Sequence, residues 1–350
     1  MIIKTNYEEI FKIDRAILEN IDPEIINFLE FWESNSESLI VNTSGSTGIP
    51  KEIKLKRKTL ITSAKYTLEY FKLKNNSTFY CCLPVKYIGG KMMLVRAFVN
   101  KGQIILSKPS KNAVKGINEK IDFSAMTSMQ VEDSISKLGF SNIKKLIIGG
   151  SSINGKLLEK IDDLKTECYQ TFGMTETASH IAVRKLNGSN KNLQYECLKH
   201  VKISTNSHGQ MIINSPELDI KSLTTNDIIK ITDYQLFKYI GRIDNIINTG
   251  GIKVNPEHLE YKLYKTILNN NFFIDKISDN YLGQKMILIA LESIDINIIL
   301  KAINKVKDKK KRPKAILITK QFIYTANNKI DRNLTKISSL KHGNLILLSK

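Results

Sequence analysis

A segment rich in glycine and hydroxyl side chains, residues 42–51, limits most strongly the folds open to this chain. It reads NTSGSTGIPK, follows the apolar residues 39–41 and ends at Lys51. Glycine lets backbone amides approach an anion closely, while hydroxyls and a lysine supply donors and charge. A Walker A loop requires glycine where Pro50 stands and a hydroxyl residue where Glu52 stands. We therefore expect a phosphate-binding loop on a fold other than that of the P-loop NTPases.

The composition sets further limits on function. The 350 residues carry 53 Lys and Arg against 34 Asp and Glu, a formal net charge of +19. This charge suits an anionic ligand or a nucleic acid, but the lysines are scattered, which favours a compositional bias. The cysteines form no CxxC pair, so neither zinc nor a disulfide framework is expected. Because the sequence shows neither a signal peptide nor an apolar run of about 18 residues, we expect a cytoplasmic protein without a membrane partner.

Strands and helices alternate through the first half of the chain, which predicts an α/β sheet with ligand loops at the strand ends. After residue 184, short strands separated by turns indicate a small β-rich part up to about Gly241, and a mixed pattern beyond Asp244 indicates a small α+β unit. The predicted strands are 78–84, 103–106, 145–148, 168–172, 272–277, 285–291 and 315–319, and the predicted helices lie within 7–33 and at 59–71, 88–99, 154–163, 256–268 and 296–306.

Further motifs carry polar groups that suit a nucleotide, although each alone is compatible with an ordinary surface loop. FGMTE follows a predicted strand, so Thr175 can donate to a phosphate oxygen and Glu176 can hold Mg²⁺. Asp227 offers a carboxylate to ribose hydroxyls. The GRIDN motif that begins at Gly241 supplies an arginine and an acid, and NNKIDR places Lys329 in a tight loop.

In series, these motifs resemble those of the adenylate-forming superfamily of acyl-CoA synthetases, luciferases and peptide-synthetase adenylation domains. The series TSGSTGxPK, GG, FGMTE, Asp, GRxDxxI, GG, VxPxxxE and NKIDR covers about residues 39–335. The resemblance implies an enzyme that uses ATP, Mg²⁺, coenzyme A and a small-molecule carboxylic acid. It also implies a large N-terminal domain, 1–243, and a small mobile C-terminal domain, 244–350, which rotates about a hinge at Asp244 between two half-reactions. Since only about forty residues precede the phosphate loop, we expect a shortened N-terminal subdomain.

The resemblance gives each matching residue a role. Lys329, Thr175 and Glu176 would be catalytic, with Glu176 also holding the metal. In the second half-reaction, Gly250 and Gly251 would move beside the pantetheine channel of coenzyme A. The residues implied to bind ATP are Thr43, Ser44, Gly45, Ser46, Thr47, Gly48, Lys51, Gly149, Gly150, Ser151, Phe172, Gly173, Asp227 and Arg242.

The helix predicted at 88–99 bears on the identity of the acid, because it carries Arg96 among apolar side chains. A buried guanidinium needs a carboxylate partner, and no obvious protein acid lies nearby in sequence. The stretch resembles that of the 2-succinylbenzoate:CoA ligases of menaquinone synthesis, whose substrate has one carboxylate to activate and one free to anchor. By this resemblance, Tyr87, Gly90 and Arg96 are substrate residues. In the alternative, Arg96 extends along its aliphatic stem to place its charge in solvent.

Three functions remain open at the level of sequence. One is AMP-forming ligation of 2-succinylbenzoate to coenzyme A, and another is the same reaction with a different aryl or short acyl acid. The third is a non-catalytic protein that binds an adenylate or a nucleic acid through its +19 charge. The presence of Lys329 and Glu176 favours an enzyme, and because no DNA- or RNA-binding motif is found, no nucleic-acid partner is expected.

Overall fold

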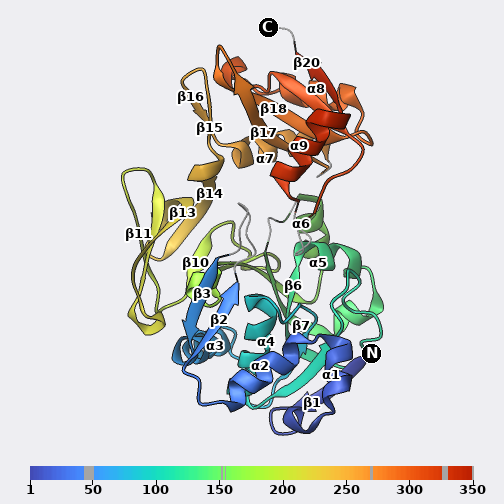
Figure 1. Ribbon diagram of the computed structural model, residues 1–350, viewed down its shortest axis with the longest axis vertical. Helices are drawn as coiled ribbons and strands as arrows, with labels where there is room; N and C mark the ends of the chain where they lie inside the picture. Colours follow the sequence, from blue (N-terminus) through green and yellow to red (C-terminus); the bar gives the residue numbers. More distant parts are fainter. Residues whose placement is uncertain (43–50, 151–152, 154, 269–270, 325–329, 349–350) are drawn as a thin grey trace.

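The computed structural model describes residues 1–42, 51–150, 153, 155–268, 271–324 and 330–348. Its described strands form a twelve-stranded sheet, a six-stranded sheet and a separate two-stranded pair. The large sheet and its helices make up the lower body in Figure 1, and the smaller sheet makes up the upper body, coloured orange to red. The predicted α/β class, with a small α+β unit at the C-terminal end, is confirmed.

Parallel strands form the centre of the large sheet and are covered on both faces. Side chains alternate along a strand, so Phe79 and Cys81 enter one core while Tyr80 and Cys82 enter the other. In spatial order these strands are β5 (Gln103–Ser107), β4 (Thr78–Cys81), β6 (Ile121–Thr127), β7 (Ile143–Gly149) and β8 (Glu167–Gly173). One face is covered by α1 (Arg15–Ile21), α2 (Glu24–Glu33), α3 (Arg57–Tyr70) and α4 (Ile88–Asn100), and the other by α5 (Ser128–Ser134) and α6 (Gly155–Asp162).

Helix α4 is buried on nearly all sides. Its apolar residues from Met92 to Phe98 join the same core, and the helix lies against α3 and the sheet. A helix that is apolar all round belongs inside a domain rather than on its surface. This placement leaves a charged residue of α4 no route to solvent.

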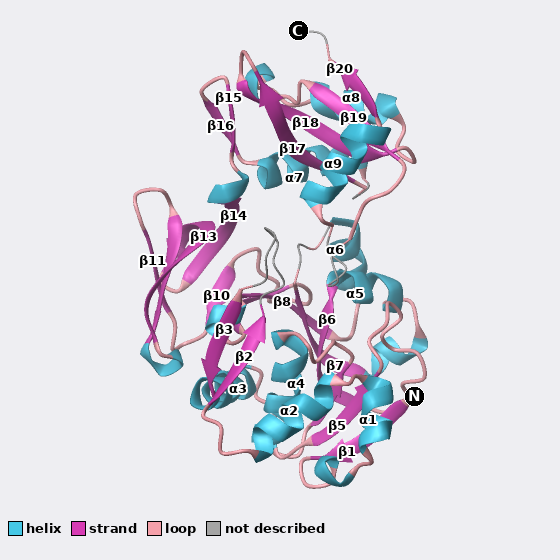
Figure 2. Cartoon of the chain, viewed as in Figure 1, coloured by secondary structure: helices cyan, strands magenta, loops and turns pink. Residues whose placement is uncertain are grey.

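The large sheet continues with antiparallel strands at both edges (Figure 2). On one side β1 (Ile2–Asn6) pairs with β5. On the other side the order is β9 (His180–Lys185), β10 (Tyr195–Cys197), β14 (Leu236–Arg242), β13 (Ile220–Asp233), β12 (Gln210–Ser215) and β11 (Lys202–Thr205). Strands β10 to β14 correspond to the predicted β-rich part. The separate pair is β2 (Ser38–Asn42) with β3 (Glu52–Lys56), where Asn42 faces Glu52 and the ends of the predicted phosphate loop are held together.

The small sheet has the order β16-β15-β18-β19-β20, with β17 also paired to β18. Helix α7 begins where Asn255 accepts a hydrogen bond from the His258 amide (2.7 Å). Glu260 on α7 and Arg332 at the start of α9 form two hydrogen bonds of 2.8 and 2.9 Å, which tie these helices together. The elements are β15 (Ile247–Thr249), β16 (Ile252–Val254), α7 (Pro256–Ile267), β17 (Phe272–Asp279), β18 (Gly283–Leu291), α8 (Ile296–Asn304), β19 (Ala315–Thr319), α9 (Arg332–His342) and β20 (Asn344–Leu347). Among the described residues, no helix has the length and apolar character needed to cross a membrane.

Two adjacent glycines of α4 test how closely this helix is packed. A Cβ on Gly90 would lie 2.6 Å from the carbonyl carbon of Pro84 and 2.8 Å from the Val85 nitrogen, whereas one on Gly89 would meet nothing closer than 3.4 Å. Because backbone atoms cannot yield as a side chain does, we expect Gly90→Ala to lower the free energy of unfolding by about 1–3 kcal/mol. Gly89→Ala, the matched control, should leave it unchanged or raise it by about 0.5 kcal/mol. Urea unfolding of both variants checks this, and equal midpoints would contradict it.

Candidate active site

The structure brings two predicted nucleotide residues, Gly149 and Phe172, to the carboxyl ends of the adjacent parallel strands β7 and β8. A Cβ on Gly149 would lie 2.8 Å from the Thr171 hydroxyl, so a side chain there would crowd the neighbouring strand. Gly150 follows with a φ of +84°, a conformation that favours glycine. Ligands of open α/β sheets bind at this edge, which agrees with an adenine pocket. The third residue of this motif, Ser151, lies outside the described residues.

A tight turn joins β8 to β9 and carries the rest of the FGMTE motif. Gly173 pairs with His180 across the two strands, and a Cβ on Gly173 would collide with the Ser179 carbonyl oxygen. The Thr177 hydroxyl closes the turn, because it accepts from the Met174 amide (3.1 Å) and donates to the Ser179 carbonyl (2.7 Å). Gly173 therefore has a packing role that is independent of any nucleotide contact.

Thr175 and Glu176 form a 3₁₀ turn that packs against β3. Strand β3 begins directly after Lys51. Within the described part of the chain, the half-buried Glu176 carboxylate has no hydrogen-bonded or ion-paired partner, which suits a cation ligand such as Mg²⁺. Lys51, which precedes the first residue of β3, is exposed. The other residues predicted for the phosphate loop, Thr43, Ser44, Gly45, Ser46, Thr47 and Gly48, lie outside the described residues.

Asp227 and Arg242, the predicted ribose residues, face each other on β13 and β14. The Arg242 guanidinium donates to both oxygens of Asp244 (2.9 and 2.6 Å) and lies 3.7 Å from an oxygen of Asp227. Burial raises the pKa of Asp227, Arg242 opposes this, and the negative charges of Asp244, Glu257 and Glu176 add to it. The roles of Asp227 and Arg242 toward a ribose stay predictions.

Asp244, the predicted hinge, lies in the segment between β14 of the large sheet and β15 of the small one. Besides its contact with Arg242, it accepts a hydrogen bond from the Asn226 side chain (3.2 Å). The hinge position thus coincides with the passage between the two sheets, while its use as a pivot stays a prediction.

Of the two segments predicted to exchange places, the one with Gly250 and Gly251 lies within the described residues. Gly250 and Gly251, with φ of +58° and +78°, form the tip of the β15–β16 hairpin, which points away from the large domain in Figure 1. Lys329 lies outside the described residues, and the residues Tyr324 and Ile330 form a β-bridge with each other. The described orientation therefore does not bring the two glycines to the other predicted site residues.

Of the predicted substrate residues, Arg96 has the most unusual surroundings. It is 1% exposed, so the alternative in which its charge reaches solvent is wrong, because the residues of α4 from Gly90 to Phe98 are buried. Its Nη2 donates to the Ser179 hydroxyl (2.5 Å) and lies 3.5 Å from Nδ1 of His180, and its Nη1 is 3.6 Å from the Met93 sulfur. Its Nε has no partner among the described residues. Burial lowers the pKa of Arg96 to about 9.

The other two substrate predictions have simpler outcomes. Tyr87 is half-buried and precedes the first residue of α4, whereas Gly90 is buried against the Pro84–Val85 backbone. Sequence reasoning missed Ser179 and His180, although both follow the FGMTE motif closely in the chain. Their position just after the turn that carries the FGMTE motif is the sequence feature that could have indicated them.

The sequence model of a family described as AMP-binding enzyme matches residues 28–206. The chain belongs to this family. It is 24% identical to a 2-succinylbenzoate–CoA ligase of Listeria monocytogenes over 345 residues, which covers 90% of this chain and 72% of the relative. A ligase of the same name from Lactococcus lactis is 23% identical, with coverages of 93% and 80%. The resemblance inferred from the motifs is confirmed.

Solved structures agree with this assignment. An acyl-CoA synthetase (AMP-forming)/AMP-acid ligase II-like protein from Dyadobacter fermentans is 29% identical, with a TM-score of 0.65 over 97% of this chain and 100% of that one. The O-succinylbenzoate coenzyme A synthetase of Bacillus subtilis, solved with ATP and magnesium, has a TM-score of 0.71 at 17% identity, covering 85% of this chain and 69% of that one. The second likeness extends the agreement in fold to a protein of low sequence identity.

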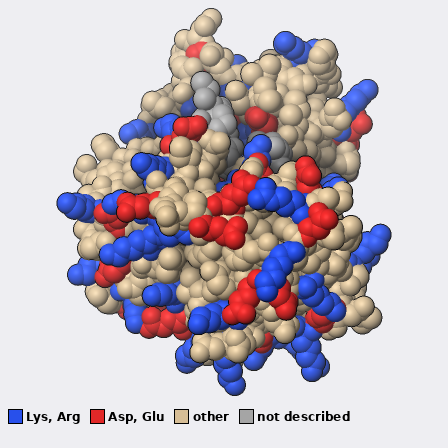
Figure 3. Space-filling view, turned by 60° about the horizontal axis from the view of Figure 1, so that its bottom comes forward, with Lys and Arg blue, Asp and Glu red and all other residues tan. Residues whose placement is uncertain are grey.

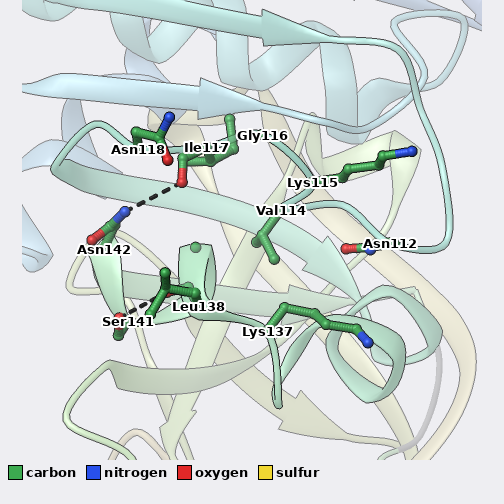
Figure 4. A pocket seen from close by; sticks show the side chains of 11 residues that line it. Asn112, Val114, Lys115, Gly116, Ile117, Asn118, Lys137, Leu138, Ser141 and Asn142 are labelled. Carbon is green, nitrogen blue, oxygen red and sulfur yellow. Dashed lines mark hydrogen bonds between the residues drawn. The ribbon is translucent and has the colours of Figure 1, made fainter.

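A pocket of about 480 Å³ lies away from the predicted nucleotide residues of this AMP-binding enzyme. Its lining residues fall within the segments 112–118 and 137–142, which precede β6 and β7 (Figure 4). It therefore opens at the amino ends of the parallel strands, whereas Gly149 and Phe172 lie at the carboxyl ends. We assign it no part in the chemistry of this site. On the face shown in Figure 3, Lys and Arg are interspersed with Asp and Glu and form no single basic stripe.

The elements of the two sheets of this AMP-binding enzyme touch at the first turn of α6. The Tyr264 hydroxyl, from α7, accepts a hydrogen bond from the Lys156 amide (2.8 Å), one of the donors that a helix start leaves free. A Cβ on Gly155 would lie 2.7 Å from a carbon of the Tyr264 ring, so glycine lets the ring approach the helix. This contact helps to fix the described orientation of the domains.

We expect Tyr264→Phe to lower the population of the described orientation of the two sheets, while the aromatic ring keeps its contact with Gly155. Losing the hydrogen bond costs about 1 kcal/mol, which shifts the ratio of domain orientations about fivefold. Energy transfer between dyes on Lys115→Cys and Asn297→Cys measures the shift, and the four natural cysteines are buried. Tyr261→Phe, a 62% exposed tyrosine of the same helix, is the control. Identical distance distributions for the two variants would disprove the role of this contact.

Proposed function

We propose that this protein is an ATP-dependent, AMP-forming ligase that joins 2-succinylbenzoate to coenzyme A. Membership of the AMP-binding enzyme family supports the reaction type, and the names of its relatives support the acid. The observation that carries the choice of acid is the burial of Arg96 without a carboxylate among its described partners. Because ATP and coenzyme A are cytoplasmic metabolites, we infer that the protein acts in the cytoplasm.

Arg96 suits the anchoring carboxylate of a diacid. Its contacts with Ser179, His180 and Met93 are all to neutral groups, and its Nε–H remains open among the described residues. Removing a guanidinium from water without a counter-charge is costly, as the lowered pKa of Arg96 reflects. A substrate carboxylate would supply both the counter-charge and an acceptor for the open donor. A monocarboxylic acid, whose only carboxylate goes to the reaction, would leave this arginine uncompensated.

In the first half-reaction, a carboxylate oxygen of the acid attacks the α-phosphorus of ATP. An acyl–phosphate bond forms, and the bond to the departing pyrophosphate breaks. Negative charge grows around phosphorus, so donors held in place beforehand lower the barrier. Thr175 and Lys329 are the proposed donors, and Asp227 with Arg242 would hold the ribose. Glu176 would hold Mg²⁺, which supplies positive charge beside the triphosphate.

In the second half-reaction, the thiolate of coenzyme A attacks the acyl carbon, and AMP leaves. We propose that residues 244–350 rotate as a body against residues 1–243 about Asp244, which exchanges Lys329 for Gly250 and Gly251. The described orientation has the hairpin of the two glycines on the far side of the small domain, which supports its assignment to the first half-reaction.

A panel of carboxylic acids tests the proposed reaction. With ATP and Mg²⁺, we expect 2-succinylbenzoate to release AMP and pyrophosphate, with the thioester formed only when coenzyme A is added. Benzoate and short fatty acids should be at least about tenfold poorer in kcat/KM, because each has a single carboxylate and leaves Arg96 without a second one. AMP release by none of the acids would refute the enzymatic proposal, and preference for a monocarboxylic acid would refute the choice of 2-succinylbenzoate.

Arg96→Met, which keeps the length and apolar character of the side chain, tests the anchoring role. We expect the KM for 2-succinylbenzoate to rise about 10- to 100-fold, because a charge-assisted hydrogen bond of about 1.5–3 kcal/mol is lost. The KM for 3-benzoylpropionate, which lacks the second carboxylate, should change less than about threefold. Initial rates of pyrophosphate release with each acid measure this. A similar rise in KM for both acids would show that Arg96 does not bind the second carboxylate.

A further inference from the structure

Arg96 is the first member of a chain of hydrogen bonds that crosses the core and includes a buried histidine. His180, which is 5% exposed, lies between Arg96 on α4 and Thr67 on α3. Its Nδ1 is 3.5 Å from Nη2 of Arg96 and 3.3 Å from the Ser179 hydroxyl. Its Nε2 is 3.4 Å from the hydroxyl of Thr67, which is also fully buried. The imidazole therefore contacts both helices with opposite nitrogens.

The outer members of this chain fix which nitrogen of His180 carries the hydrogen. The Thr67 hydroxyl donates to the Ser63 carbonyl (3.0 Å), so its oxygen is left to accept from Nε2–H. At the other end, Arg96 can only donate, so its contacts with Ser179 and Nδ1 require acceptors there. The Ser179 hydroxyl accepts from Arg96 and can donate its own hydrogen to Nδ1. All donors point one way, from the guanidinium to the backbone of α3.

We propose that His180, as the neutral Nε2–H tautomer, is a positioning residue that holds the Arg96 guanidinium in place for a substrate carboxylate. This inference rests on the proposed function and extends it to a residue that need not touch the acid. Since Ser179 ends the turn that carries Thr175 and Glu176, the chain links recognition of the acid to the phosphate-facing turn.

The electrostatics of the site agree with a neutral imidazole. Burial lowers the pKa of His180 well below 6.5, and the charge of Arg96 and the nearby His200 lower it further. A protonated ring would set Nδ1–H against the guanidinium and place two cations side by side. A neutral ring instead leaves the charge of Arg96 uncompensated by the described protein groups and available to an anion. The histidine thus orients the arginine without neutralising it.

The first test needs no substrate. Ring nitrogen shifts of ¹⁵N-histidine-labelled protein, assigned with His180→Gln, should show the Nε2–H tautomer of His180 unchanged from pH 8 to pH 6. Thr67→Val, which removes the acceptor of Nε2–H at constant shape, should shift these signals, while Thr59→Val, another buried threonine of α3, should not. An Nδ1–H tautomer, or protonation above pH 6, would overturn the proposal whether or not the enzyme uses 2-succinylbenzoate.

The second test uses the kinetics of the whole enzyme. We expect His180→Leu to raise the KM for 2-succinylbenzoate about tenfold or more, with the KM for ATP within about threefold. His180→Gln, whose amide can accept and donate on opposite sides, should recover most of this loss. In an Arg96→Met background, His180→Leu should add less than about twofold, because the residue it positions is gone. His200→Phe, a buried histidine stacked on Tyr66 without hydrogen bonds to its ring in the described structure, is the control and should stay within about twofold.

The outcomes separate this proposal from the proposed function. If wild-type enzyme turns over 2-succinylbenzoate but equal losses appear for Leu and Gln at His180, or the loss persists without Arg96, the positioning role is refuted. If wild-type enzyme activates no acid, the function is refuted, and the tautomer measurement still decides the state of the hydrogen-bond chain. Melting temperatures of all variants, compared with that of His200→Phe, identify a loss of activity that comes from unfolding.

Discussion

The pairing of Gly173 with His180 is the constraint on which the site depends. At this point the parallel sheet changes to antiparallel, and the chain reverses so tightly that a side chain on Gly173 would collide with the Ser179 carbonyl. The turn presents Thr175 and Glu176 at the carboxyl edge of the sheet and, six residues after Met174, returns His180 into the core. One short reversal thus fixes both the groups that we propose to face the phosphates and the partners of Arg96.

A cation buried without an acid contributes little to folding, because its desolvation is offset only by neutral hydrogen-bond partners. Arg96 is among the largest fully buried side chains of the protein, and its contacts include an aromatic face at 6.0 Å, that of Phe123. A buried arginine without an acidic partner is expected where it contributes to substrate selectivity rather than to the stability of the fold. The surrounding core of α3, α4 and the sheet supplies the rigidity that keeps this charge in a single position.

Much of the architecture was readable from local patterns. Strand β19 and helices α3 and α4 were predicted nearly to the residue, because their apolar periodicity and bounding residues are local signals. Strands β1, β9 and β20 and helix α9 were not, since their formation depends on pairing or packing with distant segments. The motifs also predicted roles for Glu176 and Asp227 toward metal and ribose, and these roles stay predictions. The role of His180 could not be found this way, because it arises from contacts with α3 and α4 that no spacing in the sequence records.

The contact between the Tyr264 ring and Gly155 has a consequence for how substitutions can change the arrangement of the two sheets. The hydrogen bond uses a backbone amide, which every residue other than proline supplies at position 156, whereas the fit of the ring depends on the missing side chain at position 155. A single methyl group at that position would act as a wedge between the domains without altering any group that meets a nucleotide or an acid. In the proposed cycle, this would change the balance between the two half-reactions without changing the residues proposed to carry out the chemistry.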